Sequence, residues 1–341
     1  MTEGRAPAAL RAAAPMEAET AAALPDGEGW WFEPKWDGFR CLAFRDGGEV
    51  ILQAKSGKPL TRFFPEVAAM VAATSADRFA LDGELLIAVD GAFSFDALQL
   101  RLHPAASRVR MLAEREPATL AAFDMLEAPG GRDLRAEPLS RRQAALAAFL
   151  QRHGGPRLIA TPGTEDRNVA QGWLDDGLLE GVVAKRLADP YAEGERAMLK
   201  VKRVRTADCV VGGYRYATRS PTVGSLLLGL YDEAGRLDHV GFTSGFAGVD
   251  RAALTRTLEA LRGGPGFTGD APGGPSRWST ERSAAWTPIR PELVVEVSYD
   301  HVSGGRFRHG TRLLRLRPDK APAQCRMEQI QDRTRDQIRA R

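Results

Sequence analysis

The sequence predicts an α+β protein of two domains, and three observations support this class. The chain has 341 residues, about twice the length of a typical single domain. In the first two thirds, short strand-like runs mix with helical runs without a strict strand–helix–strand order. After residue 205 the runs become almost entirely strand-like. We therefore expect one domain over 26–204 and a second over 205–325, with the boundary near Val204.

The composition is that of a globular protein in a reducing compartment. Apolar residues make up 43% and charged residues 27% of the chain, and no run approaches the ~18 apolar residues of a membrane span. The three cysteines are scattered and lack any CxxC spacing, which disfavours a disulfide framework or a zinc site. We expect a cytoplasmic protein without a membrane partner.

The two ends of the chain differ from its body. Residues 1–25 are rich in Ala, Pro and Glu and show neither apolar periodicity nor a signal-like apolar region, so we expect a mobile arm or a loosely docked leader. Residues 306–341 hold ten arginines, one lysine and four acidic residues, a net charge of +7. We expect a basic tail over 326–341. The charge of residues 306–341 is explained equally well by a polyanionic partner or by simple solvation.

The first domain is predicted to contain eight strand-like runs and three helices. Asp46-Gly47-Gly48 is a turn between two strands, and Pro65 suits the first turn of a helix. Asp82-Gly83 is expected to bend a long run into a pair of strands, and Gly177 to cap a helix. The expected strands are 30–36, 39–46, 49–54, 79–89, 118–126, 156–161, 180–186 and 198–203, and the expected helices are 65–73, 139–152 and 169–177.

The second domain is predicted to contain five strands and one clear helix. Asp250 is a suitable N-cap for a helix over 250–261, and Gly263-Gly264 a suitable stop. The Gly/Pro-rich stretch 263–276 reads as a surface loop. Five strands with a helix after the third are compatible with a small Greek-key barrel such as the OB-fold. The expected strands are 208–216, 223–232, 237–245, 292–300 and 312–318.

The segment most indicative of chemistry is Glu33-Pro34-Lys35-Trp36-Asp37-Gly38-Phe39-Arg40. A Lys-x-Asp-Gly sequence alone is explained more simply as a turn with a solvated lysine. Further short motifs follow in one order, and six ordered motifs are hard to obtain by accident. The five others are Asp82-Gly83-Glu84, Phe123-Asp124, Glu180-Gly181-Val182-Val183-Ala184-Lys185, Lys200-Val201-Lys202 and Arg315-Leu316-Arg317-Pro318-Asp319-Lys320.

This set resembles the covalent nucleotidyltransferases, which comprise ATP-dependent DNA ligases, RNA ligases and mRNA capping enzymes. It is most similar to the small bacterial C-type ATP-dependent DNA ligases and to the ligase module of bacterial end-joining proteins. The resemblance covers about residues 25–325 and implies an adenylation domain (nucleotidyltransferase, ATP-grasp-like) followed by an OB-fold domain. It implies an enzyme that seals 5′-phosphate/3′-hydroxyl nicks in duplex DNA through lysyl-AMP and adenylylated DNA.

By this resemblance Lys35 attacks the α-phosphorus of ATP and carries the AMP. An amine nucleophile must be unprotonated, and crowding by other cations favours the neutral form. Lys185, Lys200 and Lys202 could supply that crowding while holding the phosphates. Mg²⁺, with Mn²⁺ as an alternative, prefers carboxylate and phosphate oxygens. The implied metal ligands are Glu84 and Glu180, with Glu84 shared with the ribose.

The resemblance also assigns the base, the sugar and the leaving group. Phe123 would stack on adenine with Val182 or Val183 on the other face, and Glu33 would meet the exocyclic amine. Arg40 would contact the ribose or a phosphate. The catalytic Arg317 and Lys320 would act on the β,γ-phosphates during the first step, which requires a hinge near Val204.

Two positions depart from the family pattern. Lys55 stands where relatives usually have an arginine that touches the nucleotide, so the charge remains without the bidentate geometry. Met198 stands where relatives often have a tryptophan.

The expected partner is nicked double-stranded DNA, met by a monomer that associates with the nucleoid. End-binding or polymerase repair proteins are candidate protein partners. The alternatives are an RNA ligase or capping-type enzyme, and a non-catalytic nucleic-acid-binding protein of the same fold.

Overall fold

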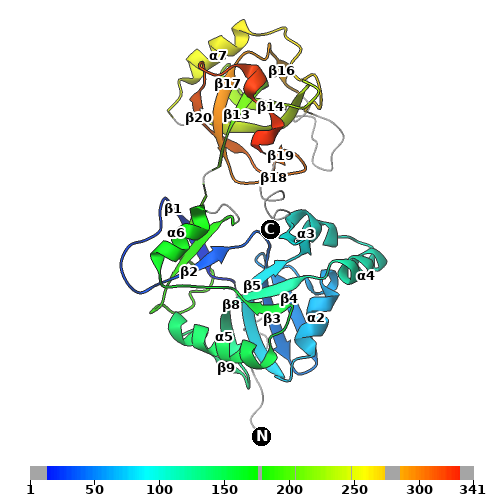
Figure 1. The fold of residues 1–341 in the computed structure, drawn as a ribbon, viewed down its shortest axis with the longest axis vertical. Helices are drawn as coiled ribbons and strands as arrows, with labels where there is room; N and C mark the ends of the chain where they lie inside the picture. The colour runs from blue at the N-terminus through cyan, green and yellow to red at the C-terminus, as the bar shows by residue number, and fades with distance from the viewer. Residues whose placement is uncertain (1–13, 176–178, 204, 247, 273–284, 331–341) are drawn as a thin grey trace. The chain divides into compact units, whose positions relative to one another are not determined.

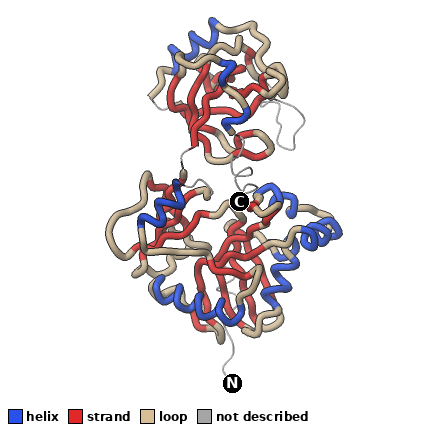
Figure 2. The backbone as a smooth tube through the Cα atoms, in the orientation of Figure 1, coloured by secondary structure: helices blue, strands red, loops and turns tan. Residues whose placement is uncertain are grey.

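Two compact units make up the computed structural model, and they divide between residues 203 and 204. The structure describes residues 14–175, 179–203, 205–246, 248–272 and 285–330 (Figures 1 and 2). Strands dominate both units, as expected for the predicted class (Figure 2). Among the described helices, none has the length and apolar character of a membrane span.

Two sheets form the centre of the first unit. One has the strand order β1-β12-β11-β2, and the other has the order β10-β8-β5-β3-β4 with β9 paired to β8. A small hairpin, β6–β7, extends from the end of β5. The strands are β1 (Glu17–Ala21), β2 (Trp30–Lys35), β3 (Phe39–Asp46), β4 (Glu49–Ala54), β5 (Arg78–Leu86), β6 (Ala88–Val89), β7 (Ala92–Phe93), β8 (Thr119–Ala128), β9 (Arg132–Asp133), β10 (Leu158–Ala160), β11 (Gly181–Arg186) and β12 (Arg196–Lys202).

Helices cover these sheets through apolar faces. In α5 the buried side chains Leu139, Arg142, Leu146 and Phe149 recur every three or four residues, the spacing that places them on one side of a helix. This face packs on β8 and β10. The helices are η1 (Thr61–Phe63), α2 (Pro65–Ala72), α3 (Phe95–Arg101), α4 (Ala106–Arg115), α5 (Leu139–His153) and α6 (Arg167–Asp175). Neither α3 nor α4 was predicted, and Gly177 lies outside the described residues.

The segment 14–25 belongs to the fold, so the expectation of a mobile arm over 1–25 is wrong for this part. Strand β1 runs parallel to β12, from the pair Glu17–Arg196 to the pair Ala21–Val201. Met16 and Leu24, on either side of β1, are buried. The strand was missed because its partner is distant in sequence and its own residues lack apolar alternation. Residues 1–13 lie outside the described range.

The expected bend at Asp82-Gly83 is also wrong, because β5 continues through both residues. Asp82 is fully buried, where its carboxylate accepts hydrogen bonds from Arg40 and Tyr191. Gly83 lies so close to β8 that a Cβ would be 2.7 Å from the Ala121 carbonyl. The pairing with β8 shifts register at this point. The Asp-Gly pair is thus an irregularity inside one strand rather than a turn.

The second unit is a closed five-stranded barrel, which confirms the expected OB-type fold. The strand order is β14-β15-β20-β17-β13, and β13 also pairs with β14 to close the ring. The helix α7 (Arg251–Ala260) follows the third strand and is capped by the Asp250 carboxylate. The elements are β13 (Arg205–Tyr216), β14 (Val223–Tyr231), β15 (Leu237–Gly245), β16 (Thr287–Pro288), β17 (Val294–Tyr299), β18 (Val302–Ser303), β19 (Arg306–Phe307), β20 (Thr311–Leu316), η2 (Pro322–Gln324) and η3 (Met327–Gln329).

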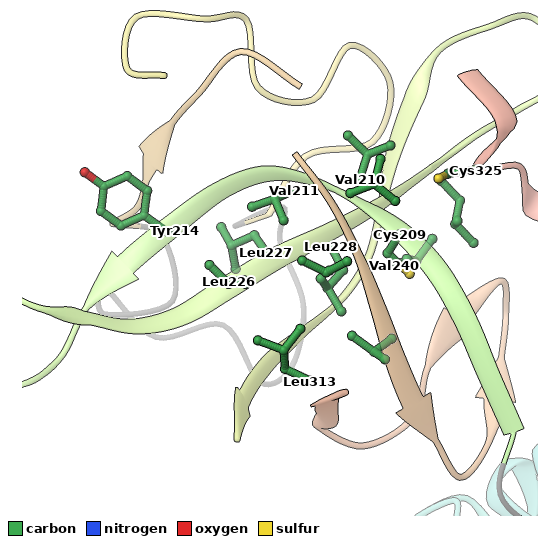
Figure 3. Close-up of a cluster of buried hydrophobic side chains, with 14 of the residues drawn as sticks. Cys209, Val210, Val211, Tyr214, Leu226, Leu227, Leu228, Val240, Leu313 and Cys325 are labelled. Atoms are coloured by element: carbon green, nitrogen blue, oxygen red, sulfur yellow. The ribbon is translucent and has the colours of Figure 1, made fainter. Parts of the chain in front are cut away.

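Continuous apolar runs of β13 and β14 fill the barrel core (Figure 3). The Phe267 ring lies over Gly212 and Gly229, where a Cβ would approach its atoms to 2.6 and 2.9 Å. Glycine is therefore required at both positions for this ring to enter the core. The labelled core residues in Figure 3 are Cys209, Val210, Val211, Tyr214, Leu226, Leu227, Leu228, Val240, Leu313 and Cys325.

The barrel unit extends past residue 325, so the expected tail over 326–341 begins too early. Ile330 is buried in the barrel core, and Arg326 forms a β-bridge with Tyr231. Gln329 bonds both backbone groups of Asp208. Polar residues that bond to backbone rather than enter the core give no apolar pattern in the sequence. Residues 331–341 lie outside the described part of the chain.

Stability of the barrel unit should fall in mild acid because of His239 in β15. Burial lowers the pKa of His239 to about 4, and the charges of Arg306 and Arg215 lower it further in the same direction. Between pH 6.5 and 4 the unfolded chain binds a proton that the folded chain does not, so the free energy of unfolding falls as the pH falls. At pH 5 the expected loss is about 2 kcal/mol.

Urea unfolding of the full-length chain at pH 7.5 and at pH 5.0 measures this loss. Pulsed hydrogen exchange reports the unfolding of residues 205–330 separately. His239→Gln should reduce the difference in the free energy of unfolding between the two pH values by about 2 kcal/mol. His309→Gln, at an exposed histidine of the same unit, should leave the difference unchanged. Equal pH dependence in the native chain and in His239→Gln would contradict the assignment.

Candidate active site

Three neighbouring strands align the residues of the candidate site in one row. Lys35 ends β2 and pairs with Gly181 of β11, which in turn pairs with Lys202 of β12. A Cβ on Gly181 would lie 2.2 Å from the Val201 carbonyl, so only glycine lets β11 and β12 approach this closely. The row places Lys35 and Lys202 on either side of Gly181, although 167 positions separate the two lysines in the sequence.

A carboxylate lies between these two lysines. Glu180, directly before β11, forms an ion pair with Lys35 and a longer one, 3.5 Å, with Lys202 Nζ. After Lys35 the chain turns at Gly38, where a Cβ would lie 2.4 Å from the Leu85 carbonyl. Glycine at this point of the Lys-x-Asp-Gly segment is therefore a steric requirement. It lets the start of β3 pair closely with β5, beginning at Phe39 and Leu85.

Lys35 opens into a pocket of about 240 Å³ formed by both sheets. Burial raises the pKa of Glu84 to about 7, although Arg40 and Lys35 act in the opposite direction. Burial lowers the pKa of Lys200, and the nearby charges of Lys202 and Lys35 lower it further. The pocket is lined by Glu17, Ala18, Glu33, Pro34, Lys35, Trp36, Arg40, Lys55, Glu84, Phe123, Val183, Lys185, Met198 and Lys200.

One end of the pocket contains a buried ion pair. Glu33 and Lys185 are 3–4% exposed, and their charged atoms are 2.6 Å apart. The other Glu33 oxygen accepts hydrogen bonds from Trp31 Nε1 at 2.9 Å and from Gln143 Nε2 at 3.4 Å. Burial raises the pKa of Glu33, against the opposing effect of Lys185. The carboxylate is held by three donors beside the Phe123 ring, over which Lys185 Nζ lies 4.4 Å from the centroid.

One expectation for this end needs correction. Val182 does not line the pocket, because it lies on the opposite face of β11 in a cluster with Phe32 and Ala184. Side chains alternate along a strand, so Val183 faces the pocket instead. Lys185 pairs with Trp31, four residues along β2 from Lys35. Its ammonium group is held by Glu33 and lies over the Phe123 ring.

A second network fixes the side of the pocket formed by β1. Arg40 donates two hydrogen bonds to Asp82, at 2.7 and 2.6 Å, and a third to the Met16 carbonyl at 3.1 Å. The Tyr191 hydroxyl donates to Asp82 at 2.6 Å and accepts from Met16 N–H at 3.0 Å. Both backbone groups of Met16 are thereby bonded to side chains. This anchors the start of β1 at the pocket wall.

Lys55 and Met198, the two residues that depart from the family pattern, both have partners beside the pocket. Lys55 follows β4, is about half exposed, and its Nζ lies 3.0 Å from a carboxylate oxygen of Glu17 in β1. Met198 is buried in a cluster with Met16, Phe44 and Tyr191. A lysine paired with a glutamate and a packed methionine thus occupy the positions expected for arginine and tryptophan.

The arrangement of these side chains suits the binding of a nucleoside triphosphate and a divalent cation. Glu180 contributes to the raised pKa of Glu84, so the two carboxylates are close enough to interact, as a shared Mg²⁺ requires. Lys35, Lys200 and Lys202 supply positive charge for phosphate oxygens. A half-buried aromatic ring and a buried carboxylate at the other end suit a flat base with an amino group.

In the second unit, the expected residues of the last motif lie at and beyond the end of β20. Arg317 Nη1 is 2.8 Å and Lys320 Nζ is 2.6 Å from the two carboxylate oxygens of Asp208. Arg317 also pairs with Asp319 at 2.9 Å. Hydrogen bonding to Arg317 lowers the pKa of Asp319 to about 2.

Comparison with known proteins identifies the family. Residues 12–202 match the family described as "ATP dependent DNA ligase domain", and residues 219–320 match "ATP dependent DNA ligase C terminal region". The first match alone spans more than half of the chain. The chain belongs to the ATP-dependent DNA ligases.

Relatives of this ligase include DNA ligases C and the ligase domain of a LigD protein, in agreement with the resemblance to small bacterial C-type ligases. DNA ligase C1 of Mycolicibacterium smegmatis is 43% identical over 329 residues, and DNA ligase C of Mycobacterium tuberculosis is 41% identical over 336 residues. Each comparison covers 93% of both chains. The crystal structure of the ligase domain of M. tuberculosis LigD is 29% identical with a TM-score of 0.51, covering 92% of this ligase and 98% of that chain.

Several residues of the ligase site were not among the site residues predicted from the sequence. Glu17 lines the pocket, Gln143 and Asp82 bond the pocket residues Glu33 and Arg40, and Tyr191 bonds Asp82. Asp82 does precede Gly83-Glu84, but its buried role was not expected. Gln143 on α5 and Tyr191 in a loop carry no sequence signal, because their function depends on neighbours more than 100 positions away.

Proposed function

We propose that this ATP-dependent DNA ligase seals nicks in duplex DNA through AMP bound covalently to Lys35. The observation that carries the proposal is the position of Lys35, at the end of β2 between Glu180 and the pocket lined by Glu84 and Lys200. An amine placed between carboxylates and cations at a pocket mouth suits attack on a phosphorus atom.

In the first step the Lys35 amine, having lost a proton, forms an N–P bond with the α-phosphorus of ATP. The P–O bond to the β-phosphate breaks and pyrophosphate leaves with the electron pair. Glu180, in contact with the amine, orients it and is suitably placed to accept the proton. Lys200 and Lys202 counter the charge that gathers on the phosphate oxygens, which is the main requirement of phosphoryl transfer.

A divalent cation, Mg²⁺ or Mn²⁺, would be held by Glu84 and Glu180. When bound it neutralises phosphate charge and polarises the phosphorus.

For the base we propose stacking on Phe123, with Val183 on the opposite side and Glu33 accepting from the adenine amino group. A carboxylate is an acceptor only, so it favours the amino group of adenine over the carbonyl of guanine. Arg40, Lys55 and Lys185 complete the nucleotide contacts. Lys185 and Gln143 hold Glu33 in the orientation that this selectivity requires.

In the later steps a 5′-phosphate oxygen attacks the AMP phosphorus and the N–P bond to Lys35 breaks. The 3′-hydroxyl then attacks the 5′-phosphorus of the adenylylated DNA, and AMP leaves. Arg317 and Lys320 act only earlier, on the β,γ-phosphates during attack by Lys35. We further propose a monomer that acts on the nucleoid in the cytoplasm, with end-binding or polymerase repair proteins as partners.

Labelling and sealing assays test this function together. Incubation with α-labelled ATP and Mg²⁺, followed by denaturing electrophoresis, should give a labelled chain, whereas GTP and NAD⁺ should not. Nicked duplex DNA should then be sealed in preference to nicked RNA–DNA hybrids and single-stranded RNA. Preferred sealing of RNA would favour the RNA ligase alternative, and an unlabelled chain would favour a non-catalytic binding protein.

A further inference from the structure

Asp208 holds both cations of the last motif at once. One of its carboxylate oxygens accepts from Arg317 Nη1 at 2.8 Å and the other from Lys320 Nζ at 2.6 Å. The Asp208 side chain is only 12% exposed, so water competes weakly for these charge-assisted bonds. Asp208 lies in β13, more than 100 positions from both cations, and in none of the six motifs.

Asp208 is itself held by a residue from the end of the described chain. Its N–H donates to Gln329 Oε1 and its carbonyl accepts from Gln329 Nε2, both at 3.1 Å. The amide of Gln329 thus bonds both backbone groups of Asp208, much as a neighbouring strand would. This fixes the backbone from which the Asp208 carboxylate extends.

The surrounding charges also point to orientation rather than to stability. Asp208 lies directly opposite Glu296 in the β13–β17 pair, and like charges at such positions repel. Arg317 Nη1 lies near both, at 2.8 and 3.8 Å, and Asp319 bonds the same guanidinium. Ion pairs near the surface add little stability. A guanidinium bonded by several fixed acceptors, however, has few orientations available.

We propose that Asp208, supported by Gln329, is a positioning residue that presents Arg317 and Lys320 as a pair of fixed spacing to the leaving pyrophosphate. This rests on the role proposed above for Arg317 and Lys320. Two phosphate groups in series are recognised best by two cations whose separation is set beforehand, because misplacement by about 1 Å can cost ~100-fold in rate. Asp208 touches neither substrate nor reacting atoms in this proposal.

Asp208→Asn in the full-length chain should slow single-turnover lysyl-AMP formation about tenfold at saturating ATP, with little change in the KM for ATP. An interaction made mainly as the pyrophosphate leaves affects kcat rather than KM. Sealing of a nick supplied already adenylylated should keep its normal rate. Gln329→Ala should show the same pattern more weakly. Asp232→Asn, which removes a carboxylate paired with Arg236 in the same unit, is the matched control and should change neither step.

A double variant separates the positioning role from the proposed function. In an Arg317→Ala background, Asp208→Asn should cost less than it costs in the native chain, because part of what it positions is already gone. If Arg317→Ala itself leaves the first step at its normal rate, the proposed function of Arg317 is wrong. If Arg317→Ala slows that step and Asp208→Asn does not, only the positioning role is wrong.

Two further results would overturn the proposal. Faster adenylation in Asp208→Asn would mean that the carboxylate merely masks the cations. Equal loss of both steps would indicate a purely structural role. Should Asp208→Asn fail to fold, Gln329→Ala decides, because it retains every charge and removes only the support of Asp208.

Discussion

Replacing Lys35 by alanine should abolish covalent AMP labelling completely. Lys35 is the amine at the mouth of the pocket, in contact with Glu180 and within electrostatic reach of Lys200. Lys35→Arg should be equally inactive, because a guanidinium remains protonated at any accessible pH and cannot attack phosphorus. Denaturing electrophoresis after incubation with α-labelled ATP measures the effect, which should exceed 1,000-fold.

Lys55→Ala is the matched control for this loss. Lys55 also lines the pocket, but it is half exposed and paired with Glu17, so the variant should still be labelled, at a lower rate. Lys35→Ala should in addition seal a pre-adenylylated nick, which would show that its fold and DNA binding are intact. Labelled Lys35→Ala would mean that another residue is the nucleophile.

Arg317→Ala should separate the first step of ligation from the last. Its guanidinium would orient the leaving pyrophosphate, an interaction that exists only while Lys35 attacks ATP. We expect lysyl-AMP formation to slow roughly 100-fold, the size typical for the loss of one charge-stabilising donor in a transition state. Sealing of a pre-adenylylated nick without ATP should proceed near the normal rate.

If Arg317→Ala adenylates normally but fails on the pre-adenylylated nick, Arg317 contacts DNA phosphates instead. Arg315→Ala provides the control: Arg315 lies two residues earlier, pairs with Glu296 and is mostly exposed. It should leave the first step almost unchanged.

The sequence predicted the barrel and the central motifs because both depend on local patterns. The barrel strands β13 and β14 carry continuous apolar runs, and Asp250 caps the helix α7 as expected. The Lys-x-Asp-Gly segment is recognisable because Gly38 and Lys35 must stand at a fixed spacing. Local signals of this kind are readable without knowledge of distant neighbours.

The missed features depend on tertiary contacts. Strand β1 is defined by its pairing with β12, and Asp82 is buried only because Arg40 and Tyr191 bond it. Deciding whether Val182 or Val183 lines the pocket required knowing which face of β11 the pocket lies against. Gln329 looked like part of a charged tail because its partner, Asp208, lies 121 positions earlier.

The pairing of β1 with β12 has a consequence for synthesis of the chain on the ribosome. The N–H of Met16 finds its acceptor, the Tyr191 hydroxyl, only 175 positions later. Contacts this far apart in sequence form late and slowly, because a long loop must close first. The wall that carries Glu17 therefore cannot be completed until β12 has left the exit tunnel. A nascent chain therefore completes this pocket only after nearly all of the first unit has been translated.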